Sequence, residues 1–132
     1  MRLILAGLVL SGLALLSARH IPIWSSPGTL WTKVVLEAPG DPRPLINLAA
    51  VHITEGRLTL ARYELRRAAR QARAHPAAIR VISNDLIQAN LGALYIRQGR
   101  FDRACAVLRD ESAGSSAGTV RQSLAQQWGV CD

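Results

Sequence analysis

Two stretches of this chain repeat one pattern of residues at an offset of 43 positions. They are residues 47–57 and 90–100, and each places Asn, Leu, a small residue and a closing Gly followed by Arg at matching positions. The match continues downstream with the pairs Ala61 and Ala104, and Leu65 and Leu108. A repeat of this kind indicates that one supersecondary unit is built twice and that the copies stack to bury a shared core.

The repeated units are expected to be helical, and the fold class is predicted to be all-α. No run of residues alternates with period two, and only 5% of the residues are aromatic, so the usual strand patterns are absent. Gly56 and Gly99 stand where a helix should end in a left-handed turn. The pattern predicts helices over residues 29–37, 43–55, 58–74, 83–98, 101–110 and 119–128.

The repeat resembles the tetratricopeptide repeat family, whose signature is L-G-x2-Y on one helix and a small residue on the next. The second copy has Leu91-Gly92-x-x-Tyr95, and the first has Leu48-Ala49-x-x-His52. The resemblance implies a short array of helical hairpins that cross closely at these small residues. It also assigns His52 to the tyrosine position, where packing is its expected role.

The array is expected to contain half a repeat, two repeats and a cap. Trp31 and Pro39 fit the second helix of a truncated first repeat, and residues 119–128 would cap the end. The family period is about 34 residues, so the offset of 43 leaves nine extra residues. We place them at residues 74–84, either lengthening the helix of residues 58–74 or forming a looser connection. The second copy departs from the family pattern at four positions. Gln88 stands where a large residue is expected, Leu108 replaces an aromatic residue, and Glu111 and Ser112 stand where small apolar residues are expected.

Residues 1–24 are predicted to form a membrane anchor helix with an interfacial exit, and residues 25–132 a tetratricopeptide-like helical domain. An uncharged apolar run from Leu3 to Ala18 follows Arg2. A cleavable signal would need small residues at −3 and −1, but Leu15 or Leu16 would fall at −3. Arg2 and the free amino terminus favour a cytoplasmic N-terminus in a single-pass protein, although Arg19 opposes it. This orientation would place the domain on the periplasmic or extracytoplasmic side.

Two other readings of the N-terminal half stay open. One is a cleaved signal, which would release a secreted or periplasmic binding module. The other follows from Ile21-Pro22-Ile23-Trp24 and Leu30-Trp31, which resemble the junction of membrane helix and repeats in transmembrane O-mannosyltransferase-like proteins. That resemblance implies a non-catalytic tail related to a membrane glycosyltransferase.

The net charge of +7 favours an acidic partner, and much of it lies within residues 57–80. In the helix predicted over residues 58–74, the apolar face is marked by Ala61, Leu65, Ala68 and Ala72. Four arginines run beside this face and form a predicted basic ridge: Arg62, Arg66, Arg70 and Arg73. The ridge can be a solvated helix face, or it can dock acidic protein or anionic lipid headgroups. No nucleic-acid partner is expected, because a membrane anchor opposes one.

The repeat resemblance also implies a groove for a partner protein. The positions that would clamp a carboxylate in some family members hold apolar residues, so an apolar groove for a helix or extended segment is expected. Its predicted lining is Ile46, Asn47, Ala50, Ile53, Ala89, Asn90, Ala93 and Ile96.

Catalytic and metal-binding patterns are missing from the sequence. The three histidines have no i,i+4 spacing, and Cys105 and Cys131 do not form a CxxC pair. The two cysteines can form one disulfide in an oxidising compartment, or remain one buried thiol and one tail thiol, which is the favoured alternative. We therefore expect a non-enzymatic protein without cofactor or metal. The predicted function is a membrane-anchored interaction subunit that serves as a scaffold or assembly component of a larger membrane complex.

Overall fold

The computed structural model describes residues 2–20, 24–109, 123, 125–129 and 131. The described elements are all helices, and no strand occurs among these residues, which confirms the expected all-α class for this part of the chain. They are α1 (Arg2–His20), α2 (Pro27–Glu37), α3 (Pro42–Thr54), α4 (Leu58–Ala72), α5 (Ala77–Arg97) and α6 (Phe101–Leu108).

Helices α2 and α3 begin at polar caps that precede a proline. The Ser26 side chain accepts a hydrogen bond from the backbone N–H of Thr29 at 3.1 Å. Asp41 does the same for the N–H of Arg43 at 3.0 Å. Proline at the first helical position lacks an N–H that would have no partner there, so each Pro helps to define where the helix starts.

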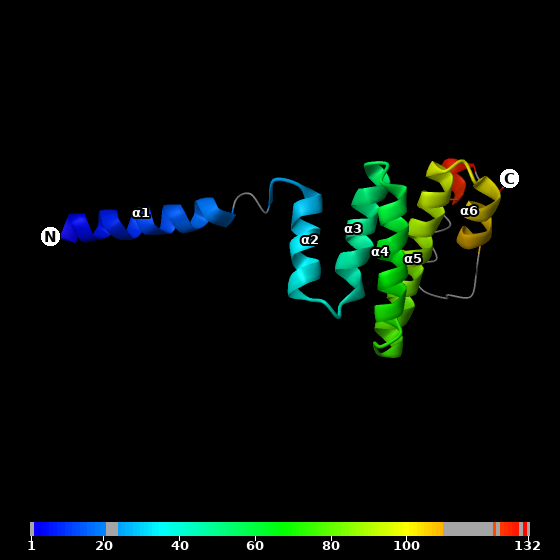
Figure 1. The fold of residues 1–132 in the computed structure, drawn as a ribbon, viewed down its shortest axis with the longest axis horizontal. Helices are drawn as coiled ribbons and strands as arrows, with labels where there is room; N and C mark the ends of the chain where they lie inside the picture. Colours follow the sequence, from blue (N-terminus) through cyan, green and yellow to red (C-terminus); the bar gives the residue numbers. More distant parts are fainter. Residues whose placement is uncertain (1, 21–23, 110–122, 124, 130, 132) are drawn as a thin grey trace.

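Helices α2 to α6 lie side by side in the order of the chain (Figure 1). Helix α3 pairs with α4, and α5 pairs with α6, as two antiparallel hairpins. Helix α5 also packs on both α3 and α4, so the two hairpins share one core. Its centre contains residues that are at most 1% exposed: Leu45, Ala49, Ala61, Leu65, Ala68 and Leu94.

The connection between the two hairpins differs from the expectation. Helix α4 ends at Ala72, and α5 begins at Ala77 directly after Pro76 and runs for 21 residues. The extra residues of the long repeat therefore lengthen the start of α5. They neither extend α4 nor form a loose connection. The physical reason is that Pro76 adopts an extended conformation with ψ of 154° and serves as the cap, after which Ala77 and Ala78 favour a helix.

Helix α2 packs on α3 and forms the edge of the array. None of its residues is buried. The loop behind it is held to the end of α4, because His75 Nε2 lies 2.8 Å from the Gly40 carbonyl oxygen and the Gln71 amide donates to the Pro39 carbonyl. This arrangement agrees with the predicted half repeat over residues 29–37.

Helix α1 stands apart from the other helices (Figure 1). The large apolar side chains described on it, from Ile4 to Leu16, are more than half exposed, from Val9 and Leu13 at 56% to Ile4 at 71%. Within the part of the chain that the structure describes, no helix meets both the length and the apolar content that a membrane crossing requires. Part of the predicted interfacial exit, residues 21–23, lies outside the described residues.

The predicted final helix, over residues 119–128, is described only in part. Residues 123 and 125–128 are helical, and the other predicted positions lie outside the described residues. Ala125 packs on a second apolar cluster, formed by Ile96, Ala104 and Leu108. That contact fits the expected role of this segment as a cap.

Candidate functional site

The turns that close α3 and α5 have the same hydrogen bonds in both copies of the repeat. In the first copy, Arg57 N–H donates to the His52 carbonyl at 2.8 Å, and Gly56 N–H donates to the Ile53 carbonyl at 3.1 Å. In the second copy, the matching pairs lie at 2.9 Å in both cases. Gly56 and Gly99 have φ angles of 75° and 68°. This is a Schellman motif, and it requires a left-handed residue after the helix, for which glycine has the lowest cost.

The small residues predicted at the hairpin crossings are buried where the helices meet. Ala49, Ala61 and Ala104 are each 0% exposed. At Gly92, an added β-carbon would lie 2.6 Å from Cδ2 of Leu108. Leu108 of α6 therefore occupies the space that a side chain at position 92 would need. The hairpin geometry implied by the repeat resemblance is therefore present in both copies.

The predicted groove residues divide into two groups. Ile46, Ile53, Ala89 and Ile96 are between 2% and 8% exposed and belong to the packed interior. Ile46 and Ile53 are covered because α5 lies against both α3 and α4, and Ile96 packs against Ala104 and Leu108 of α6. The other four, Asn47, Ala50, Asn90 and Ala93, are half-buried and remain accessible on α3 and α5. Asn90 donates its side-chain amide to the Leu86 carbonyl at 2.8 Å, so part of its polarity is used within its own helix. A binding role for these residues stays a prediction.

His52 lies beside a hollow of about 600 Å³ between α2 and α3. Its side chain is 8% exposed, and its Nδ1 atom has no hydrogen-bond partner among the described residues. Burial, followed by the positive charge of Arg57, lowers the pKa of His52 from 6.5. A neutral, buried imidazole that occupies the tyrosine position of the repeat is consistent with a packing role.

A second group with a shifted pKa, Asp41, caps the start of α3 and pairs with Arg43. Arg43 holds the pKa of Asp41 below its ordinary value through side-chain hydrogen bonds of 2.7 to 3.1 Å. Asp41 precedes the first residue of α3 and His52 lies near its last, so roughly 16 Å of helix separates them. The described residues contain no group of three His, Cys, Asp or Glu side chains that could hold a metal ion.

The predicted basic ridge lines a cleft between α4 and α5. Arg62, Arg66 and Arg73 face this cleft, whereas Arg70 is exposed on α4 outside it. The structure adds Arg80 from α5 and Arg103 from α6. The sequence pattern did not predict Arg103 as part of this surface, because Arg103 stands on a different helix and the matching position of the first copy is Leu60.

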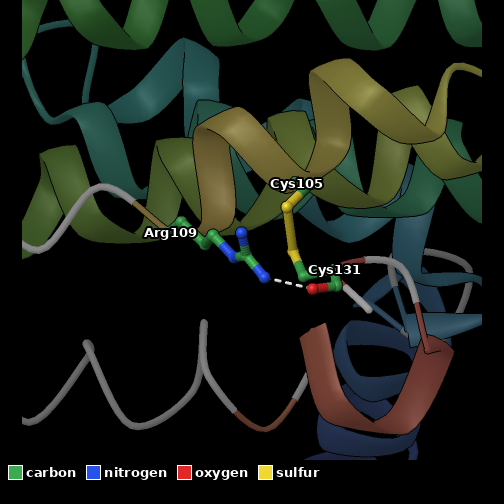
Figure 2. The surroundings of a disulfide bond; sticks show 3 residues. All are labelled: Cys105, Arg109 and Cys131. Atoms are coloured by element: carbon green, nitrogen blue, oxygen red, sulfur yellow. Dashed lines mark hydrogen bonds between the residues drawn. A yellow bond between two sulfur atoms is a disulfide. The ribbon is translucent and has the colours of Figure 1, made fainter.

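The two cysteines form a disulfide, so the favoured reading of two separate thiols is wrong (Figure 2). Their Cα atoms lie 5.2 Å apart although 26 positions separate them in the sequence. Arg109 donates a hydrogen bond to the carbonyl oxygen of Cys131 next to this bond (Figure 2). The disulfide thus joins α6 to residue 131.

Comparison with known proteins gives one family match. A model of the tetratricopeptide repeat matches residues 86–110, which include the later part of α5 and all of α6. The match supports the repeat resemblance and a protein–protein interaction module, because these repeats are generally non-catalytic interaction units. No curated protein and no solved structure matches the chain. The comparisons give no support to a link with O-mannosyltransferase-like proteins.

Proposed function

We propose that this chain is a tetratricopeptide-type interaction subunit that α1 tethers to a membrane, with its helical domain outside the cytoplasm. It would act as a scaffold or assembly component of a larger membrane complex. The observation that carries the proposal is the repeated hairpin. Both copies have the same Schellman turn, and the second copy matches the repeat family.

The surface of α1 supports the tether. The leucine, isoleucine and valine side chains described on it, from Ile4 to Leu16, are exposed, and α1 makes no packing contact with another described helix. Exposed apolar surface of this extent is unfavourable in water, so lipid or a partner helix is expected to cover it. The anchor is favoured over the partner helix because Arg2 and Arg19 flank the apolar run at both ends.

The disulfide supports the orientation of the domain. Disulfides persist in oxidising compartments and are rare in the cytoplasm. The bond between Cys105 and Cys131 therefore favours an extracytoplasmic domain, in agreement with the orientation predicted from Arg2.

The incomplete array supports dependence on a partner. Repeat arrays usually need three or more units to bury a continuous core, and the described chain has two hairpins and the half repeat α2. Leu36 of α2 is 76% exposed and lines the hollow between α2 and α3. A partner that covers this hollow or the half-buried positions on α3 and α5 would complete the burial.

A mild-detergent pull-down of the full chain from its native membranes, followed by mass spectrometry, tests the proposal. We expect a membrane protein to co-purify with the wild type and to be lost when Ala50→Arg and Ala93→Arg are introduced together, because both positions are half-buried and remain accessible at the surface. Ala77→Arg, at an exposed position at the start of α5, serves as the matched control. Circular dichroism checks that all variants remain helical. Equal recovery of every protein from the double variant and the control would contradict the interaction role.

Intact mass separates the membrane-anchored reading from the secreted one. An anchored chain retains residues 1–24 and stays in the membrane after carbonate extraction. A secreted module would begin near Ala18 or Arg19 and would be recovered in the soluble fraction. A genetically linked or fused membrane transferase would instead favour the reading as a non-catalytic tail.

A further inference from the structure

The cleft between α4 and α5 has a volume of about 740 Å³, and side chains of both helices and of α6 form its walls. Its lining is strongly basic, because five arginines from three helices face it: Arg62, Arg66, Arg73, Arg80 and Arg103. The one acidic residue in the lining, Asp85, is fully buried. The cleft therefore presents positive charge to whatever enters it.

Most of this charge is not neutralised within the described part of the protein. The guanidinium groups of Arg66, Arg73, Arg80 and Arg103 form neither a hydrogen bond nor an ion pair with another described residue. Arg62 donates to the neutral side chain of Gln98 at 3.1 Å. Guanidinium groups that converge on one hollow raise the local concentration of anions and can bind carboxylates in pairs of parallel hydrogen bonds.

The floor of the cleft is apolar. Leu65 and Ile87 are buried beneath it at 1% and 3% exposure, and Leu91 and Tyr95 are half-buried along it. A ligand that fits would therefore combine apolar side chains toward the floor with acidic groups toward the arginine-lined walls.

We propose that this cleft binds an acidic segment of a partner protein, in which Asp or Glu residues alternate with apolar ones. The inference rests on the proposed interaction function and adds a second binding surface to it, on α4, α5 and α6. The surface is separate from the half-buried positions Asn47 and Ala50 on α3.

The shape of the site favours a peptide over a membrane surface. A bilayer is flat and would engage the arginines that protrude from α4, including Arg70. Arg70 lies outside the cleft, whereas Arg80 and Arg103 reach it from other helices. A segment of chain can enter the hollow between the helices, and its carboxylates can meet arginines on more than one wall.

Fluorescence anisotropy on the full chain in a neutral detergent tests the proposal. The probe is a labelled twelve-residue peptide that alternates Glu and Leu, with a control peptide in which Gln replaces every Glu. We expect only the acidic peptide to bind, and to bind more weakly as NaCl is raised. The double variant Arg66→Glu/Arg80→Glu should weaken binding by about tenfold or more, since it removes two charge-assisted contacts and adds repulsion.

Arg70→Glu is the matched control, because it makes the same charge change on α4 outside the cleft. We expect it to leave the affinity within about twofold of the wild type. An equal loss in Arg70→Glu would overturn the proposal and indicate a non-specific charge effect. Absence of peptide binding, together with binding to phosphatidylglycerol vesicles but not to phosphatidylcholine vesicles, would overturn it in favour of a lipid surface.

The pull-down separates failure of this inference from failure of the proposed function. If Arg66→Glu/Arg80→Glu retains every partner that the wild type recovers and the acidic peptide does not bind, while Ala50→Arg/Ala93→Arg loses a partner, the cleft proposal fails and the interaction function stands. If the wild type recovers no partner that any variant loses, the interaction function itself fails.

Discussion

A β-carbon placed on Gly92 would lie 2.6 Å from Cδ2 and 2.7 Å from Cγ of Leu108. Leu108 is 3% exposed in the apolar cluster between α5 and α6, so its side chain has no open space into which it could move. In the first copy of the repeat, the same two positions hold Ala49 and Leu65, which are buried together in the main core. The two helices of the second hairpin thus lie too close together at this point to leave room for a methyl group at position 92.

Replacing Gly92 with Ala should therefore destabilise the domain. We expect the free energy of unfolding to fall by about 1 to 3 kcal/mol, which is the usual cost of overpacking a closed core. Urea unfolding followed by circular dichroism measures this change. Gly40→Ala, at a position with no atom within 4 Å of the added carbon, is the control and should have little effect. Adding Leu108→Val should recover part of the loss, and purely additive effects would argue against the contact.

The glycine after α5 is expected to matter for its backbone conformation. Gly99 has a φ of 68° with no atom within 4 Å of an added β-carbon, so any cost of Gly99→Ala comes from the left-handed backbone. We expect a loss of about 1 kcal/mol of stability. Gly99→Asn should cost less, because Asn tolerates this conformation better. Equal stability of the Ala and Asn variants would contradict this explanation.

His52 should make the stability of the domain depend on pH. Burial lowers its pKa in the folded protein below the unfolded value of 6.5, so the unfolded chain takes up the proton first. The contribution of the neutral imidazole is complete above pH 6.5, decreases as the pH falls below 6.5, and stops changing below the folded pKa. Thermal unfolding at pH 7.5 and 5.5 should show a lower Tm at the lower pH.

His52→Tyr provides the control for this prediction, because tyrosine stands at the matching position of the second copy. The variant should lose most of the Tm difference between the two pH values. Working above pH 5 keeps the measurement clear of Asp41, whose pKa lies below its ordinary 3.8. An unchanged pH dependence in the variant would assign the effect to other groups.

The disulfide should stabilise the end of the array. It closes a loop between positions 26 residues apart, for which chain entropy predicts at most about 3 to 4 kcal/mol. We expect Cys131→Ser to lower the Tm, and dithiothreitol to lower the Tm of the wild type but not of the variant. If iodoacetamide alkylates both cysteines in the unreduced, denatured wild type, the bond is absent in the isolated protein.

The sequence by itself determined the helices and the turns of the repeat. Apolar periodicity, the Schellman glycines Gly56 and Gly99, and the small residues at the crossings are local requirements, and a single chain displays them directly. The half repeat α2 also followed from residues close together in the chain. These features are confirmed because each depends on a few neighbouring φ and ψ angles or on one face of one helix.

Only the tertiary structure decided which surfaces are free. Ile46 and Ile53 are buried because α5 packs on α3 and α4 at once, an arrangement that the pattern of α3 alone does not contain. The cleft gains Arg103 from α6, and Cys105 meets Cys131 across 26 positions, for the same reason. Local sequence sets the helix and its apolar face, whereas contacts between distant residues depend on how helices pack, and that packing decides which arginines and cysteines meet.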